Sequence, residues 1–398
     1  MQRRALNVIN FDFVSPTKIY FGKDRENEIG NIISSFGFSR VLLVYGMSSI
    51  KRSGLYQRVV EKLDEAKITH FEVSGVRANP EISLSRLGIE ICRMNNIELV
   101  LAIGGGSVID TAKSIACGVY YDGDTFDFNL HKASPTKALP VGVILTISAS
   151  GSELSNSCVM MDDKTGIKQG FNHDLNKPLF AVCNPELTYS VDKYQTGCGI
   201  VDIISHSLER YFCPSNELEF ADSIALAIIK DMVKVGPICI NDPTNYDARA
   251  VMMLDGSYSH NGLTGLGKSF RFPIHAMEHI LSAYDIRIAH GAGLSVLIPG
   301  WIKFTYKYDI DKFVRFFKEV FDINVADKEE CVKIGIQSLK NFFKSIGMPI
   351  TLSELNLHES DIPNLVNLMT LNGTRLIGQG TIKTLDKEEI TLLLKDLL

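Results

Sequence analysis

The sequence predicts an α/β domain with a parallel sheet over residues 1–190, followed by an all-helical domain over residues 191–398. Three observations predict this fold class. At 398 residues the chain exceeds the size at which a single core usually keeps growing, which favours two domains. In the first half, continuous apolar runs such as RVLLVY at Arg40–Tyr45 alternate with helical periodicity, which indicates a parallel sheet covered on both faces. From Asp192 onward the strand signals stop and helical periodicity takes over.

In the first half, strands are expected where apolar residues gather between turn signals. The predicted strands are Val8–Phe13, Lys18–Phe21, Arg40–Tyr45, His70–Ser74, Glu98–Ile103, Pro140–Thr146 and Phe180–Cys183. The predicted helices between them are Gly54–Ala66, Ser83–Asn95 and Val108–Tyr120, and a hairpin turn is expected at Asp162–Gly166. Right-handed connections in such a Rossmann-like sheet place the carboxyl ends of all strands, and any ligand, along one edge.

The second half reads as a bundle of helices with short connections. The predicted helices are Thr196–Tyr211, Glu217–Val235, Asn245–Asn261, Phe272–Ser282, Val296–Tyr306, Ile310–Phe321, Lys328–Ser345, Glu359–Leu371 and Asp386–Leu397. We expect a cleft between the sheet edge and this bundle.

The composition excludes several classes of function. A net charge of −5 argues against non-specific nucleic-acid binding, which depends on a basic surface. No apolar run reaches the ~18 residues that a membrane span needs, and no apolar segment follows the arginines of the N-terminus as in a secretory signal. The eight cysteines are scattered without a Cys-x-x-Cys pair, so we expect neither a structural zinc site nor a disulfide framework, and a cytoplasmic location.

A glycine-rich turn predicts a phosphate-binding loop. Gly104, Gly105 and Gly106 separate a strand from a helix, and without side chains their backbone N–H groups can approach an anion. Ser107 is expected to be the N-cap, with Asp110 three residues later, and the helix N-terminus adds roughly half a positive charge. The pattern is neither Gly-x-Gly-x-x-Gly nor a Walker A loop. A tight turn without a ligand is the alternative.

The turn after the strand Arg40–Tyr45 bears on the kind of cofactor. Gly46, Ser48, Ser49 and Lys51 lie there, and no acidic residue is present to accept from a ribose 2′-hydroxyl and repel a 2′-phosphate. Two hydroxyls and a Lys-Arg pair are suited to a phosphate, which favours NADP(H) over NAD(H). A solvated turn with the same residues is the alternative.

The helical half contains two groups of residues with the spacing of metal ligands. Asp202 and His206 are four residues apart, so they share one face of a helix among apolar neighbours. His275 and His279 repeat this spacing, and His290 follows with two glycines beside it. For each group alone, a hydrogen-bonded core pair is the alternative. Together Asp202, His206, His275 and His290 form a ligand set that suits Zn²⁺ or Fe²⁺, and His279 then serves proton transfer.

With these motifs the chain resembles a known family, the iron-dependent (group III) alcohol dehydrogenases, within their branch of NADPH-dependent butanol dehydrogenases and aldehyde reductases. The resemblance runs essentially from end to end. It is carried by Gly104–Lys113, Ser150–Glu153, Asn184–Thr188, Gly199–Tyr211 and His275–Gly293.

The resemblance implies a fold of the dehydroquinate-synthase-like type, with a dinucleotide-binding α/β domain and a helical metal domain. It implies that Asp202, His206, His275 and His290 hold a divalent ion and that His279 lies near the reacting carbon. It also implies a cofactor site made of the following residues: Gly46, Ser48, Ser49, Lys51, Gly104, Gly105, Gly106, Ser107, Asp110, Thr146, Ser148 and Lys168. Two departures are visible. Asn184 replaces the family's usual aspartate, and the run from His275 to His290 is one residue longer than expected.

The expected function is the interconversion of primary alcohols and aldehydes, mainly aldehyde reduction with NADPH, by a metal-dependent homodimer. The alternative within the same superfold is a glycerol(-phosphate)-type dehydrogenase or a dehydroquinate-synthase-like lyase. A phosphorylated substrate needs a cluster of cations, for which Lys268, Arg271 and Arg287 are the candidates. A metallohydrolase would not need the nucleotide loop, and a non-catalytic binding module would show no turnover.

Overall fold

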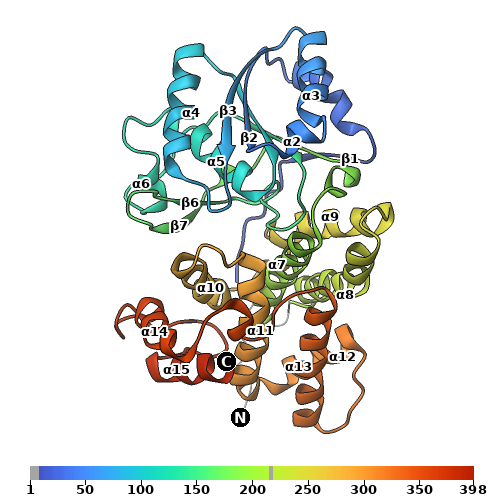
Figure 1. Cartoon of the computed structure of the whole chain (residues 1–398), viewed down its shortest axis with the longest axis vertical. Helices are drawn as coiled ribbons and strands as arrows, with labels where there is room; N and C mark the ends of the chain where they lie inside the picture. The colour runs from blue at the N-terminus through green and yellow to red at the C-terminus, as the bar shows by residue number, and fades with distance from the viewer. Residues whose placement is uncertain (1–8, 215–217) are drawn as a thin grey trace. The chain divides into compact units, whose positions relative to one another are not determined.

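The computed structural model describes residues 9–214 and 218–398. It divides into two compact units (Figure 1). The sheet unit comprises Val14–Val191, and the helical unit comprises Asp192–Leu398 together with the described residues 9–13. The chain therefore leaves the helical unit after Phe13, forms the sheet unit, and returns to the helical unit at Asp192.

The sheet unit is built on six parallel strands, as the apolar runs predict. The strands are β1 (Lys18–Phe21), β2 (Arg40–Gly46), β3 (Thr69–Val76), β4 (Leu99–Gly104), β5 (Val141–Leu145) and β8 (Phe180–Cys183). Their order in the sheet is β1-β8-β5-β4-β2-β3, and every pairing is parallel. All residues of β4, β5 and β8 are buried, which explains why these strands read as continuous apolar runs.

Helices cover both faces of this sheet (Figure 1). They are α1 (Ile29–Ser35), α2 (Ser49–Arg52), α3 (Leu55–Glu65), α4 (Ile82–Asn95), α5 (Gly106–Gly118) and α6 (Phe126–Asn129). Alternate residues of the strands, such as Val41, Leu43 and Tyr45 of β2, share one apolar core with α1 and α3. The α4–α5 pair lies on the opposite side of these strands in Figure 1.

The strand order reverses between β2 and β4, because β2 continues to β3 on one side and β4 lies on the other. In open parallel sheets, ligands bind outside the carboxyl ends of the strands at such a point. Tyr45 of β2 is paired with Ile103 of β4, so the chain leaves both strands side by side, at Gly46 and Gly104. The two turns that the sequence assigns to a nucleotide therefore lie together.

Of two further expectations for the first half of the chain, one is wrong and one is confirmed. The predicted strand Val8–Phe13 is wrong for residues 9–13, which form no strand; Val8 lies outside the described residues. The backbone N–H of Ile9 instead donates to the carbonyl of Gly267 at 3.2 Å. The hairpin turn at Asp162–Gly166 is confirmed, and it joins two antiparallel strands, β6 (Ser157–Met161) and β7 (Lys168–Asn172).

The helical unit packs around one long buried helix, α7, which contacts α8, α9, α10 and α11. Its helices are α7 (Lys193–Tyr211), α8 (Glu219–Asn241), α9 (Tyr246–His260), α10 (Pro273–Tyr284), α11 (His290–Thr305), α12 (Ile310–Phe321), α13 (Lys328–Ser345), α14 (Ile362–Thr370) and α15 (Lys387–Asp396). Among the described residues, no helix combines the length and the apolar character needed to cross a membrane.

Two helices extend by more than a turn beyond their predicted bounds, and each contains a proline. Helix α8 continues past Val235 through Pro237, and α11 begins at His290 instead of Val296 and contains Pro299. An internal proline removes one backbone hydrogen bond. The residues around both prolines are largely buried, so tertiary packing outweighs that loss. The predicted start of α8 at Glu217 lies outside the described residues.

Asn184 has a structural role in the turn after β8. Its Oδ1 accepts from the backbone N–H of Glu186 at 3.1 Å, and its Nδ2 donates to the buried carboxylate of Glu26 at 2.9 Å. An aspartate could accept the first bond but could not donate the second. Asparagine in place of the usual aspartate is therefore explained by the neighbouring carboxylate of Glu26, which needs a donor at position 184.

Candidate functional site

Helix α7 positions the first pair of predicted metal ligands. Asp192 caps the helix by accepting from the backbone N–H of Gln195 at 2.8 Å. From this start, Asp202 and His206 fall one turn apart on a buried face. The Nε2 atom of His206 lies 3.7 Å from Oδ1 of Asp202.

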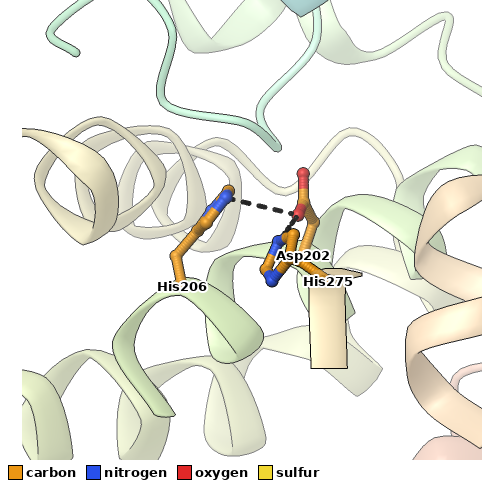
Figure 2. Close-up of side chains that lie close together, drawn as sticks. All are labelled: Asp202, His206 and His275. Atoms are coloured by element: carbon orange, nitrogen blue, oxygen red, sulfur yellow. Dashed lines mark ion pairs between the residues drawn. The ribbon is translucent and has the colours of Figure 1, made fainter. Parts of the chain in front are cut away.

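Two further helices bring histidines to the same carboxylate oxygen. His275 lies in the first turn of α10, and its Nε2 is 3.5 Å from Oδ1 of Asp202 (Figure 2). His290 is the first residue of α11, and its Nε2 is 3.7 Å from the same oxygen. The structure thus brings all four predicted ligands together, and the longer run before His290 does not displace it.

The separations between these atoms fit a shared cation better than direct hydrogen bonds. N–H···O bonds span about 2.7–3.2 Å. Two atoms that are each about 2.1 Å from a tetrahedral ion lie about 3.4 Å apart. Both Oδ1 of Asp202 and Nε2 of His275 are buried and have no hydrogen-bond partner among the described residues. Because such atoms are costly to bury, their convergence supports a divalent ion as the missing partner.

The pKa values of the two histidines in Figure 2, His206 and His275, are shifted in opposite directions. Burial, reinforced by the neighbouring His260 and His275, lowers the pKa of His206 well below its usual value. Burial also acts to lower the pKa of His275, but the carboxylates of Glu209 and Asp202 outweigh it and raise that pKa to about 9. The pocket therefore attracts positive charge at His275.

Two glutamates behind the histidines were not predicted from the sequence. The Nδ1–H group of His275 donates to Glu209 of α7, and that of His290 donates to Glu278 of α10. Both carboxylates are fully buried. A sequence signal existed, since each glutamate lies three residues after a predicted ligand, His206 or His275, on a buried helical face.

Two more histidines lie beside this cluster. The ring of His279 is centred 5.4 Å from that of His290 and 6.3 Å from that of His275. The ring of His260, which the sequence did not single out, is centred 4.0 Å from that of His206. His260 and His279 are only half-buried.

In the sheet unit, the glycine turn is shaped by the loop that follows β5. A Cβ atom on Gly106 would lie 2.4 Å from Oγ of Ser150, so a larger residue at this position would force the Ser150 side chain to move. The expected capping by Ser107 is wrong. Helix α5 begins at Gly106, its N-cap is Gly105, and no side chain caps it. The N-terminal N–H groups of α5 thus have no side-chain acceptor at the cap, which suits an anion-binding turn.

Asp110 and a buried lysine fix this loop from within the sheet unit. The carboxylate of Asp110 accepts from Oγ of Ser152 at 2.6 Å and from the backbone N–H of Val159 at 2.9 Å, and burial raises its pKa. The fully buried Lys113 donates to the carbonyls of Ser152 and Ser157 at 2.7 and 2.8 Å. The sequence did not indicate this role for Lys113.

The remaining predicted cofactor residues lie around the same edge of the sheet. Ser48 precedes α2, which contains Ser49 and Lys51. The Lys51 ammonium lies 5.2 Å from the ring centroid of Tyr45 and 4.7 Å from that of Tyr56.

Thr146 and Ser148 follow β5, at the carboxyl edge. The backbone N–H of Thr146 donates to the carbonyl of Gly104 at 3.1 Å, and Oγ of Ser148 is buried without a hydrogen-bond partner among the described residues. Lys168 begins β7, and its charge acts to lower the pKa of Asp110, against the larger effect of burial.

The three cations considered for a phosphorylated substrate do not gather into an anion site. Lys268 is buried and paired with Asp222, and Arg287 forms an exposed pair with Asp285. Arg271 donates to the carbonyl of Phe270 at 3.2 Å. The structure therefore gives no support to a site for a phosphorylated substrate made of these three residues.

Family models match both units. The model described as iron-containing alcohol dehydrogenase matches residues 16–185, and the model of the C-terminal part of the Fe-containing alcohol dehydrogenase family matches residues 196–398. The chain belongs to the iron-containing alcohol dehydrogenase family. The resemblance read from the motifs is confirmed, as is the fold class.

Individual relatives of this iron-containing alcohol dehydrogenase cover nearly the whole chain. The NADH-dependent butanol dehydrogenase A of Clostridium acetobutylicum is 40% identical over 98% of this chain and 99% of its own. The NADPH-dependent aldehyde reductase YqhD of Escherichia coli is 29% identical over 95% of this chain and 97% of its own. The crystal structure of NADH-dependent butanol dehydrogenase A from Thermotoga maritima is similar with a TM-score of 0.91 and 36% identity, covering 98% of this chain and 99% of that one.

Membership establishes the general chemistry. This iron-containing alcohol dehydrogenase is an oxidoreductase that interconverts alcohols and aldehydes, and it uses a metal and a nicotinamide cofactor. The relatives include proteins named for NADH and proteins named for NADPH, so the family does not decide between the two cofactors.

Proposed function

We propose that this dehydrogenase reduces an aldehyde to a primary alcohol with NADPH, at a divalent ion held by Asp202, His206, His275 and His290. The observation that carries the proposal is the convergence of three imidazole Nε2 atoms within 3.5–3.7 Å of one buried carboxylate oxygen, Oδ1 of Asp202. One carboxylate and three imidazoles suit Fe²⁺ or Zn²⁺ better than Mg²⁺ or Ca²⁺, which prefer oxygen ligands.

The chain's own residues would act around this ion as follows. When bound, the ion supplies Lewis-acid stabilisation of negative charge on the substrate oxygen, and the nicotinamide supplies the hydride. Asp202 contributes the negative charge that retains the ion, and the buried faces of α7 and α10 keep water from its protein ligands. His279 lies beside His290 and is half-buried, so it is placed to pass a proton between substrate oxygen and solvent.

For the cofactor, we propose that Gly46, Ser48, Ser49 and Lys51 meet the 2′-phosphate of NADPH. The support is the absence of any carboxylate from residues 46–52 and the presence there of Lys51 and Arg52. We propose that the other contacts with the cofactor are made by the following residues: Gly104, Gly105, Gly106, Ser107, Asp110, Thr146, Ser148 and Lys168. Helix α5 begins at this turn with no side-chain cap, which favours a pyrophosphate at its N-terminus.

A primary alcohol or its aldehyde is proposed as the substrate because the relatives are named butanol dehydrogenases and aldehyde reductase. We further propose residues 1–190 and 191–398 as the functional domains, except that the described residues 9–13 pack with the second one, and a homodimer as the assembly. A cytoplasmic location is proposed because all eight cysteines are buried and form no disulfide, the pattern of a reducing compartment.

The decisive experiment compares wild type with two alanine variants after anaerobic purification. Metal content is measured, and the oxidation of NADPH and of NADH is followed with a series of aldehydes. Wild type should retain about one divalent ion per chain and oxidise NADPH with the higher kcat/KM. His275→Ala should lose both the ion and activity, whereas His279→Ala should keep the ion and turn over more slowly, by about 10²–10⁴-fold. Equal metal loss in both variants contradicts the division of roles, and a higher kcat/KM with NADH contradicts the cofactor proposal.

A further inference from the structure

We propose that Glu209 and Glu278 are positioning residues of the metal site, and that Glu209 cannot be replaced by glutamine although Glu278 can. This inference rests on the proposed function, because it concerns how the liganding imidazoles are held. Hydrogen bonds between side chains connect the three helices of the site in sequence, α7 to α10 and α10 to α11. A carboxylate of α7 holds the histidine of α10, and a carboxylate of α10 holds the histidine of α11.

Glu209 uses both of its oxygens on donors from α10. Its Oε1 accepts from the backbone N–H of Ile274 at 2.6 Å, and its Oε2 accepts from Nδ1–H of His275. The N–H of Ile274 belongs to the first turn of α10, which no side chain caps from the N-cap position. The carboxylate therefore caps the N-terminus of α10 and orients an imidazole at once, so that Nε2 is the ring nitrogen of His275 that faces Asp202.

Glu278 is held differently. Its Oε2 accepts from Nδ1–H of His290, whereas Oε1 is buried and has no hydrogen-bond partner among the described residues. Only one of its oxygens is therefore needed as an acceptor. His206 shows a third arrangement, because its Nδ1 is also buried without a hydrogen-bond partner among the described residues. Two of the three imidazoles are thus fixed by carboxylates.

The number of donors decides what glutamine can do at each position. Glutamine has one acceptor oxygen and one NH₂ group. At position 209 the NH₂ group must face either Ile274 N–H or His275 Nδ1–H. In the second case the imidazole must move its proton to Nε2, the atom that binds the ion. At position 278 the oxygen can face His290 while the NH₂ group takes the place of the unpartnered Oε1. Both substitutions remove one negative charge, so they are matched in charge and differ in acceptor count.

The test is a zinc-affinity measurement by competition with a chromophoric chelator, on wild type, E209Q, E278Q and H275A. Mutating a carboxylate that hydrogen-bonds to a metal ligand typically weakens metal affinity by about 10–100-fold. We expect E209Q to fall in that range and E278Q to lose less than tenfold. Cobalt-loaded samples give a second reading, because the visible spectrum reports the ligand set. E209Q should alter that spectrum, and E278Q should preserve it.

Each outcome separates the inference from the proposed function. If wild type and H275A bind zinc equally, the proposed function fails. If H275A loses zinc but E209Q and E278Q match wild type, or lose affinity equally, the inference is overturned. A lower melting temperature of metal-free E209Q with unchanged zinc affinity and cobalt spectrum also overturns it, because the role would then be structural.

A measurement on wild type covers the case in which E209Q does not fold. Zinc-loaded protein labelled with ¹⁵N-histidine should show His275 and His290 with the proton on Nδ1. An unprotonated Nδ1 at His275 overturns the inference.

Discussion

Asp202 shows at the residue scale how function conflicts with stability. Its Oδ1 is buried, has no hydrogen-bond donor among the described residues, and faces three imidazole nitrogens. A carboxylate oxygen buried in this way costs free energy unless a cation compensates it. By the same argument, the ionised carboxylate of Asp255 in α9 destabilises the fold, because its Oδ2 is also buried without a hydrogen-bond partner among the described residues.

Asp255 gives a pH prediction. Burial, helped by the nearby charge of Asp231, raises the pKa of Asp255 from 3.8 to about 7. A carboxyl whose pKa is raised by folding contributes stability that is full below its unfolded pKa and lost as pH rises through its folded pKa. We therefore expect Asp255→Asn to melt at a higher temperature than wild type at about pH 8, with a smaller difference at about pH 5.

Thermal melting at both pH values checks this prediction. The control is Asp231→Asn, which removes the charge of an exposed neighbour and should raise the melting temperature less. A difference between Asp255→Asn and wild type that stays constant from pH 5 to pH 8 would contradict the assignment.

At the scale of elements, the site depends on how closely α11 approaches α7. A Cβ atom on Gly291 would lie 2.2 Å from the carbonyl oxygen of Cys198, a backbone atom of α7. Backbone cannot move aside as a flexible side chain can. Gly291 therefore limits how closely its neighbour His290 can approach Asp202 and His206 of α7.

We expect Gly291→Ala to lower the free energy of unfolding by about 1–3 kcal/mol or more, as overpacking does, and to weaken metal retention. Urea unfolding and metal analysis measure the two effects. Gly236→Ala on α8 is the control, because its Cβ would meet side-chain atoms at 3.3 Å and alanine favours a helix. Equal stability of the two variants would show that α11 can shift without loss.

The sequence predicted elements best where local pattern and packing agree. The central strands and the helices Ile310–Phe321 and Lys328–Ser345 were found, because their apolar periodicity is regular. The start of α11 was missed because Gly291 and Gly293 are typical of loops. Only their close contacts, with Cys198 of α7 and Glu278 of α10 respectively, explain them. The sequences of β6 (SCVMM) and β7 (KQGFN) lack a regular alternation of apolar and polar residues, so these strands were predicted only through their turn.

For the site, the sequence predicted the candidate metal ligands, but it did not predict the glutamates that hydrogen-bond to two of them. Asp202 and His206 share a helix, so their spacing was visible. The contact between Glu209 and His275 joins residues on different helices. The three-residue spacing from His206 marks Glu209 as a candidate but does not reveal its partner. The same holds for Lys113, whose acceptors lie on a distant loop.

At the scale of the whole molecule, the described N-terminal residues belong to the helical unit and carry exposed apolar side chains. Ile9, Phe11 and Phe13 are 46%, 50% and 42% exposed. Exposed apolar residues grouped in this way are typical of a contact with another chain, and most homomeric contacts follow a two-fold axis. They support the proposed homodimer.

We expect Phe11→Asp to shift the protein toward monomer, because a charge would then be buried at the contact. Light scattering over a range of concentrations measures the mass. Ser53→Asp, at an exposed position of the sheet unit, is the control and should keep the wild-type mass. A wild-type protein that is monomeric at all concentrations would contradict the homodimer.

The path of the chain has a consequence for how the protein is made. The sheet unit is an insertion within the helical unit, since the described residues 9–13 group with Asp192–Leu398. On the ribosome, Ile9 is synthesised long before Gly267, to whose carbonyl its backbone N–H donates. The sheet unit can complete its own contacts while translation continues. The described residues 9–13 cannot complete their contacts with the helical unit until Gly267 has been translated. A chaperone that binds nascent apolar segments would therefore have its longest opportunity at these residues.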